Sequence, residues 1–314
     1  LIAYLMGLSI GVHLLNLLTL PGIVLVYYFR KFEFSWKGFL ISLGISAVLL
    51  SLLMYGIMPG LVTISAKLDI FSRNTLGLPL NSGLISHFIL LIVTFILAVR
   101  MTIISNDRTR ISVFAAAAFF LSGIWVISGS AFLNIVLLGS VIFLAWYLAG
   151  RYKVVLNTIL TAVMVILIGY SAIAIIVIRS SAQPPLNENQ PDNPFSLLYF
   201  LNREQYGQRP LFRGAYYNAP VIDYEDGKPK YSIEDGKYKI TAYNLETIHD
   251  PRFITLFPRM WSDQPDHARV YQEWGKIKGV PVTVTDRSGE KKLVRKPTFR
   301  ENLRFMFTYQ FGYM

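Results

Sequence analysis

Long apolar runs are the feature of this sequence that most constrains its fold. Crossing the roughly 30 Å hydrocarbon core of a bilayer takes about 20 apolar residues in a helix. Runs near that length lie at residues 1–28, 38–58, 83–99, 111–129, 131–148 and 154–178. Only 16% of the chain is charged, against about 25% in soluble proteins. The sequence therefore predicts a polytopic α-helical membrane protein with about six spans, the first broken near Pro21, because proline removes an amide donor.

The distribution of basic residues predicts the orientation of these spans. Short loops rich in Lys and Arg stay in the cytoplasm. Eight basic residues follow the first, third and fifth runs, namely Arg30, Lys31, Lys37, Arg100, Arg108, Arg110, Arg151 and Lys153. Only Lys67 and Arg73 lie in loops on the opposite side. We therefore expect a multi-pass protein of the bacterial inner (cytoplasmic) membrane whose C-terminal domain, after Arg179, lies in the periplasm.

Residues 59–79 form the longest expected outer loop, and their pattern is helical. Apolar side chains recur at helical spacing at Leu61, Ile64, Leu68 and Phe71, while Lys67 and Arg73 remain free to face water or lipid headgroups. This pattern predicts an amphipathic helix at the outer membrane surface. Such a helix either anchors the chain to the surface or shapes the floor of an active site there.

The composition changes after the last apolar run, which indicates a linker at 179–194 and a mixed α/β extracytoplasmic domain at 195–297. Asn193 and Pro194 form a helix start, with Asn as cap and Pro at the first helical position. Asp226-Gly227 and Asp235-Gly236 predict hairpin turns between short strands, because Asp-Gly supplies the positive φ angles that such turns need. Residues 280–285 and 292–294 predict another hairpin.

Residues 298–314 are expected to begin a membrane-proximal amphipathic helix. Thr298 and Glu301 fit a capping box, in which each side chain satisfies a free backbone amide near the other. The residues that follow include Leu303, Phe305, Met306, Phe307 and Phe311. They are too apolar for a fully solvated helix, so we expect the segment to return toward the membrane.

Charge and composition exclude several classes of function. The formal net charge is +11, but the excess lies mainly in loops beside the apolar runs, so we expect no nucleic-acid partner. The absence of cysteine excludes disulfides and a thiol nucleophile. Before Arg179 the acids are Glu33, Asp69 and Asp107, none within an expected span. Because coupled transporters usually carry carboxylates within the bilayer, this argues against that class.

Two groups of residues are candidates for binding a lipid-linked substrate. His13 and Asn16 lie three residues apart in the first run, and polar side chains within a membrane helix commonly mark function; packing between helices is the alternative. Arg203, Arg209 and Arg213 follow closely on the last run, and arginine suits phosphate recognition. Structural ion pairs are the alternative for them.

Metal and cofactor signals are weak. His249 with Asp250, and His267 with Asp263 and Asp266, do not have the spacing of a known metal site, and no nucleotide-binding or nucleophile motif is present. Cofactor use is therefore not indicated, and dependence on a divalent metal is left open.

Several segments of the chain together resemble a known family. They are residues 7–18 (GLSIGVHLLNLL), 74–79 (NTLGLP), 199–207 (YFLNREQYG), 259–262 (RMWS) and 301–314. They are similar to the bacterial membrane proteins grouped as domain of unknown function 2723, described as protein O-mannosyltransferase-like and placed with the GT-C glycosyltransferases. These motifs are descriptive signatures of the family and include no catalytic residue.

The resemblance implies a function and its partners. Enzymes of this kind transfer a sugar, here mannose-like, from a polyprenyl-phosphate donor to an extracytoplasmic acceptor such as a protein Ser/Thr or a glycan. Their catalytic acid lies in the first outer loop, which implies that the chain is a fragment that begins after it and is inactive alone. Membrane lipid, donor and acceptor are thus the expected partners. The alternative is a non-enzymatic transporter or envelope-assembly scaffold whose periplasmic domain binds a partner.

Overall fold

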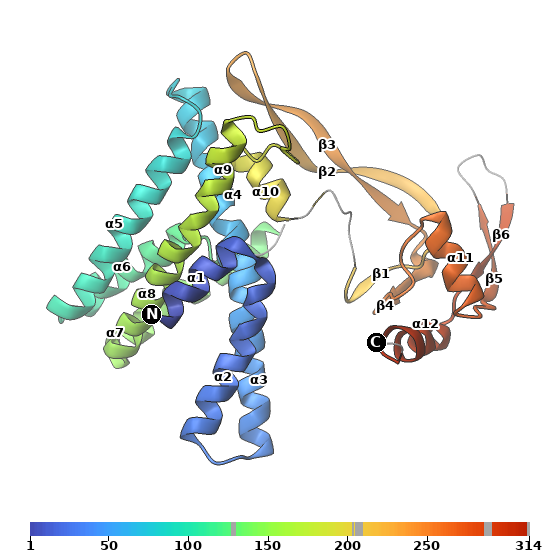
Figure 1. The fold of residues 1–314 in the computed structure, drawn as a ribbon, viewed down its shortest axis with the longest axis horizontal. Helices are drawn as coiled ribbons and strands as arrows, with labels where there is room; N and C mark the ends of the chain where they lie inside the picture. Colours follow the sequence, from blue (N-terminus) through green and yellow to red (C-terminus); the bar gives the residue numbers. More distant parts are fainter. Residues whose placement is uncertain (127–129, 203, 205–209, 286–290, 313–314) are drawn as a thin grey trace. The chain divides into compact units, whose positions relative to one another are not determined.

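A computed structural model of the chain describes residues 1–126, 130–202, 204, 210–285 and 291–312 (Figure 1). The chain forms two compact units, Leu1–Gln205 and Tyr206–Met314. The domain start expected at residue 195 falls inside the first unit, because α10 (Pro194–Leu201) packs against α4 (Met58–Ile70).

The first unit is helical throughout. Its remaining helices are α1 (Ile2–Val12), η1 (Leu14–Leu18), α2 (Thr19–Lys31), α3 (Trp36–Ser51), η2 (Leu52–Ile57), η3 (Phe71–Thr75), α5 (Ser82–Ile104), α6 (Arg108–Leu121), α7 (Ala131–Arg151), α8 (Lys153–Tyr170), η4 (Ser171–Ile173) and α9 (Ala174–Ser181). Within the described residues, four continuous helices are long and apolar enough to cross a membrane, which is fewer than the six expected. They are Trp36–Thr75, Ser82–Ile104, Ala131–Arg151 and Lys153–Ser181.

The two missing spans have separate physical reasons. The first run breaks at His13, which is extended (φ −151°, ψ 117°) and leaves α1 with 11 residues. It does not break at Pro21, which lies in the first turn of α2, where helix amides have no intrahelical acceptor. The fourth run yields α6 with 14 residues, about 21 Å at 1.5 Å per residue. That length is too short to cross the hydrocarbon core.

The expected outer loop at 59–79 is instead mostly a continuation of a membrane helix. Residues 36–75 form one helix of 40 residues, in which η2 and η3 are π-helical turns. Leu61 is 1% exposed and faces the interior of the unit, whereas Phe71 is exposed. The predicted helical character is confirmed, but the face that carries Leu61 packs against protein. A position at the membrane surface stays a prediction.

Two of the basic loops lie together at one end of this unit. Lys153 Nζ donates to Ser105 O at 2.6 Å, which joins the α7–α8 turn to the α5–α6 turn. Arg108 Nε donates to Trp146 O at 3.0 Å, and its guanidinium carbon lies 3.2 Å from the Trp146 ring centroid. The α5–α6 and α7–α8 turns, which are distant in sequence and both basic, therefore share one end of the unit.

Glycines allow two helices of the unit to approach closely. A Cβ at Gly7 of α1 would collide with the backbone oxygen of Ile166 in α8, and a Cβ at Gly169 would lie 2.5 Å from the backbone oxygen of Tyr4. Gly7 and Gly11 are four residues apart on the same helix face. Membrane helices commonly pack through small residues in this way. Lipid tails are as apolar as the side chains, so close van der Waals contact has to drive the association of the helices.

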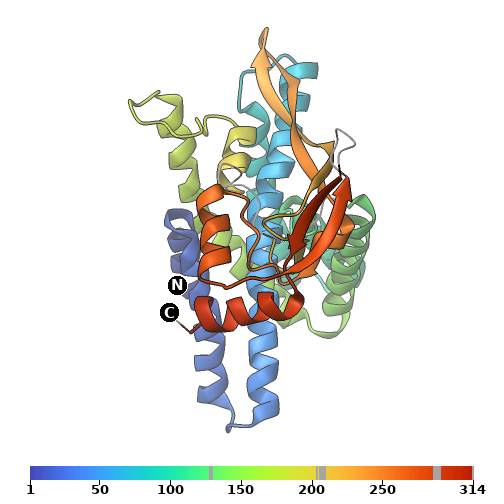
Figure 2. The same ribbon diagram turned by 90° about the vertical axis from the view of Figure 1, so that its right-hand side faces the viewer.

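In its described residues, the second unit contains three two-stranded antiparallel sheets, two α-helices and the short helical segments η6 and η7 (Figure 2). Its elements are β1 (Arg213–Ala215), β2 (Val221–Glu234), β3 (Lys237–His249), η6 (Pro251–Phe253), β4 (Ile254–Leu256), α11 (Pro265–Glu273), β5 (Val280–Thr285), β6 (Lys291–Lys296), α12 (Phe299–Phe305) and η7 (Met306–Gln310). The sheets pair β1 with β4, β2 with β3 and β5 with β6.

Of the two turns predicted from Asp-Gly pairs in this unit, one is confirmed and the other is wrong. Asp235 and Gly236 have φ of 50° and 74° and join β2 to β3, as predicted. Asp226-Gly227 is not a turn, because β2 runs through it with a shift of register between Asp226 and Pro229. The β5–β6 hairpin is confirmed.

The core of the second unit is small and aromatic. Tyr216, Tyr217, Met260 and Phe305 are its buried members, and Tyr271 lies edge-on to Phe305 with ring centroids 5.4 Å apart. The capping box predicted for Thr298 and Glu301 is confirmed at the start of α12. Phe305 thus ties α12 to the core of this unit.

Candidate functional site

The candidate site is the polar end of the helical unit, opposite its basic loops, where residues 69–83 turn from η3 into α5. Asp69, fully buried, accepts hydrogen bonds from Gly83 N at 2.8 Å and Asn81 N at 3.2 Å. The first amides of a helix lack intrahelical acceptors and carry partial positive charge. The Asp69 carboxylate therefore acts as a cap for α5. A Cβ at Gly83 would collide with the Asp69 backbone, so only glycine fits there.

Asp69 belongs to the continuous helix Trp36–Thr75, whose 40 residues are more than a bilayer core requires, so the expectation that no acid lies within a span stays a prediction. The sequence hid the capping role because the amides that Asp69 binds come twelve and fourteen residues later, across a turn. Hydrogen bonds to backbone amides are typical of a structural carboxylate. An ion relay would need the carboxylate to face a pathway.

Arg73 and Asn81 supply a donor and an acceptor in the same turn. Arg73 Nη1 donates to Leu78 O at 3.4 Å, and Asn81 Nδ2 donates to Asp192 O at 3.1 Å. Within the described residues, Arg73 Nε and Asn81 Oδ1 are buried atoms without a hydrogen-bond partner. Because both atoms are buried, a bound water is the partner that suits them.

Deeper in the unit, a buried histidine joins three helices. His87 is fully buried; its Nε2 donates to Leu121 O at 3.0 Å, and its Nδ1 lies 2.7 Å from Ser65 Oγ. Ser65 is equally buried and also donates to Leu61 O. A serine and a histidine at this distance resemble a nucleophile with its base, but neither side chain is exposed. The pair is a packing contact between α4, α5 and the end of α6.

His13 and Asn16 lie at the helix break between α1 and α2. His13 is exposed, and its Nδ1 accepts from Leu15 N at 3.2 Å, which caps η1. Asn16 Nδ2 donates to Ser9 O at 3.1 Å. The two residues do not share one helix face as expected, because the helix ends between them. Both side chains stabilise the break, and His13 remains accessible.

Of the three candidate arginines, the structure describes Arg213. Arg203 and Arg209 lie outside the described residues. Arg213 is exposed in β1, where it pairs with Leu256 of β4, and no ion pair or hydrogen bond of its guanidinium occurs within the described part of the chain. An exposed arginine in this state is available to bind an anion.

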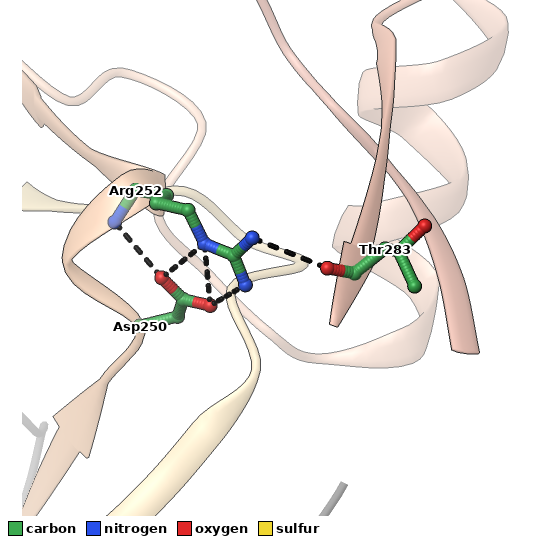
Figure 3. Close-up of polar contacts among 3 residues, drawn as sticks. All are labelled: Asp250, Arg252 and Thr283. Carbon is green, nitrogen blue, oxygen red and sulfur yellow. Dashed lines mark hydrogen bonds and ion pairs between the residues drawn. The ribbon is translucent and has the colours of Figure 1, made fainter. Parts of the chain in front are cut away.

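The histidines and acids of the second unit are used in local contacts. Asp250 forms a bidentate ion pair with Arg252, whose Nη1 donates to Thr283 O at 3.2 Å (Figure 3). The hydrogen bond from Arg252 lowers the pKa of Asp250 below its usual value. Ser262 Oγ lies 2.9 Å from His267 Nδ1. Across the described residues, no group of three His, Cys, Asp or Glu side chains is placed to share a metal ion.

An apolar groove between α5 and α8 is a feature that the sequence did not indicate. Its lining is almost entirely apolar and is contributed by Phe88, Leu91, Ile92, Phe95, Met164, Leu167, Ile168 and Ser171. Helical periodicity predicts which residues face inward, but not where two helices separate enough to leave a groove. Its walls suit a hydrocarbon chain.

Comparison with known families identifies two matching regions. Residues 1–36 match the family model described as Protein O-mannosyl-transferase TMEM260 N-terminal domain. Residues 207–307 match a family of unknown function, DUF8416. The model for domain of unknown function 2723 does not match, so that resemblance is corrected to an O-mannosyltransferase-like relation. Comparisons with curated proteins and with solved structures found no match.

Proposed function

We propose that the chain is part of a membrane glycosyltransferase that moves a mannose-like sugar from a polyprenyl-phosphate donor to an extracytoplasmic acceptor. The observation that carries this proposal is the match of residues 1–36, which form α1, η1 and α2, to the N-terminal domain of an O-mannosyl-transferase. That match covers only a small part of the chain. The donor, the acceptor and the GT-C architecture are accordingly part of the proposal.

The polar and apolar features of the helical unit support a lipid-linked donor. A polyprenyl chain needs an apolar surface, which the groove lined by Phe88 and Leu167 provides. His13 stays accessible at a helix break. None of these features supplies a base, so in this proposal the catalytic acid lies elsewhere in the protein.

We assign the donor phosphate to arginines near the start of the second unit. The phosphate gains negative charge as the sugar leaves, so cations aimed at it stabilise the transition state. Arg203, Arg209 and Arg213 are the proposed groups. Arg213 has an exposed guanidinium, and arginine binds phosphate oxygens in a bidentate manner.

The test is mannose transfer by the full-length protein in proteoliposomes, with mannosyl-phosphoryl-polyprenol as donor and a Ser/Thr peptide as acceptor. Arg203→Gln, Arg209→Gln and Arg213→Gln are compared with Arg269→Gln, a matched control at an exposed arginine of α11. Loss of one charge-assisted hydrogen bond, about 1.5–3 kcal/mol, predicts a roughly 10- to 100-fold slower transfer. If the folded wild-type protein transfers no sugar, the proposed activity is wrong. If all four variants match wild type, the phosphate site lies elsewhere.

A binding scaffold is the second candidate, and one observation favours it. The β2–β3 hairpin exposes apolar side chains such as Leu245 (70% exposed) and Ile240. An exposed apolar hairpin is typical of surfaces that bind another protein. Replacing Leu245 with Ser separates the candidates, because it should weaken partner binding without changing sugar transfer.

A further inference from the structure

The outward face of α12 and η7 carries an apolar pair that the core of the second unit does not use. Phe305 packs inward against Tyr271. On the outward side, Phe307 is 63% exposed and Phe311 62% exposed, and their ring centroids lie 6.3 Å apart. Arg300 and Arg304 precede them at spacings of seven and three residues, so all four share one face of the helix.

Cations without an ion-pair partner lie on α12 and on the segments that are hydrogen-bonded to it. Arg304 Nη2 donates to Gly275 O and Lys276 O, and Glu301 Oε1 accepts from Lys278 N, which binds residues 275–279 to α12. Arg295 Nη1 donates to Lys278 O, which adds β6 to the same region. Six cations lie in this region, and none is in an ion pair within the described residues; they are Lys276, Lys278, Arg295, Lys296, Arg300 and Arg304.

The acid of this region does not neutralise the cations by ion pairing. Burial raises the pKa of Glu301, but hydrogen bonds from the backbone amides of Thr298, Lys278 and Gly279 outweigh burial and lower it. Its oxygens thus point at amides that cap α12 and fix the 278–279 turn. The region remains positive on its surface.

We propose that the face formed by Arg300, Arg304, Phe307 and Phe311, with the cations around it, docks the second unit onto the anionic headgroups of a lipid bilayer. Aromatic side chains that partition into the interface, flanked by Lys and Arg, are the pattern of interfacial membrane helices. Each cation near an anionic surface contributes about 1 kcal/mol. A protein partner would have to supply acids opposite this many cations, whereas the same chain carries helices that are long and apolar enough to cross a membrane.

The chain contains no cysteine, so a single introduced thiol gives a background-free probe. Phe307→Cys is labelled with the polarity-sensitive fluorophore NBD and reconstituted into vesicles of phosphatidylcholine with or without phosphatidylglycerol. The control is Ser232→Cys, an exposed position on the β2–β3 hairpin. We expect the label at 307 to be blue-shifted and quenched by shallow spin-labelled lipid only in the anionic vesicles, and the label at 232 to be unaffected.

A charge variant tests the electrostatic part separately. In the Phe307→Cys background, Arg300→Gln should lower the ratio of docked to undocked protein about five-fold at low salt. Three results would overturn the proposal: equal emission from both labels in anionic vesicles, equal quenching with and without phosphatidylglycerol, or a label at 307 that is already shielded in detergent without lipid. The last result would indicate a protein contact. Because no substrate is added, failure here is independent of the proposed transferase activity.

Discussion

Replacing Asp69 tests whether the buried carboxylate is a structural cap. In Asp69→Ala, Gly83 N and Asn81 N lose an anionic acceptor at 2.8 and 3.2 Å in a site that water does not reach. Each charge-assisted hydrogen bond is worth about 1.5–3 kcal/mol, so the loss of two should cost about 3–6 kcal/mol. For a unit of this size, 1 kcal/mol corresponds to roughly 2–4 °C in melting temperature.

Two assays follow from this magnitude. The melting temperature of the detergent-solubilised chain should fall by about 6–24 °C in Asp69→Ala. Asp69→Asn, which keeps one acceptor oxygen, should lose about half as much. Hydrogen exchange should localise the effect, with the amides at 81 and 83 exchanging at least about 100-fold faster. An Ala variant that melts like wild type and keeps these amides protected would refute the capping role. A variant that stays folded but loses sugar transfer would indicate a role in catalysis.

Two further predictions concern the packing of each unit. Gly7→Leu should destabilise the α1–α8 contact by about 1–3 kcal/mol and so lower the melting temperature. Gly44→Leu is the control, because a Cβ there would meet nothing within 4 Å. Equal melting temperatures of the two variants would refute the close packing of α1 on α8. In the second unit, the lowered pKa values of Asp250 and Glu301 mean that the folded state favours their charged forms. The stability that these two carboxylates give to the folded unit is present above their unfolded pKa of about 4. It is lost as the pH falls through their folded pKa values. The melting temperature, measured from about pH 7 to about pH 3, should show this loss of stability. The loss should be smaller in Asp250→Asn, because that variant lacks the ion pair with Arg252.

Local signals predicted the parts of the fold that depend on a few adjacent residues. Asn193 with Pro194, Thr298 with Glu301, and Asp235 with Gly236 each act within four residues of chain. Their geometry is set by the backbone groups beside them, so no knowledge of tertiary structure is needed. The same rule failed at Asp226-Gly227, where pairing with β3 prevailed over turn propensity.

Features set by tertiary contacts were not predictable in this way. His13 ends α1 through bonds of polar side chains, without the glycine or proline that usually marks a helix end. The capping role of Asp69 was not predictable, because the amides that it binds lie across a turn that periodicity does not specify. Of the candidate site, the sequence indicated His13, Asn16 and Arg213, but it did not indicate that His13 and Asn16 flank a break.

The account depends most directly on the second unit lying on the side of the membrane opposite the basic loops. That side is inferred from eight basic residues on one side against two on the other, and the contact of Lys153 with Ser105 agrees with it. The decisive measurement fuses a reporter that is active only outside the cytoplasm after Ser181 and, separately, after Arg110. We predict activity for the fusion after Ser181 and none for the fusion after Arg110; the reverse pattern would contradict the orientation and the outer-face transferase proposed from it.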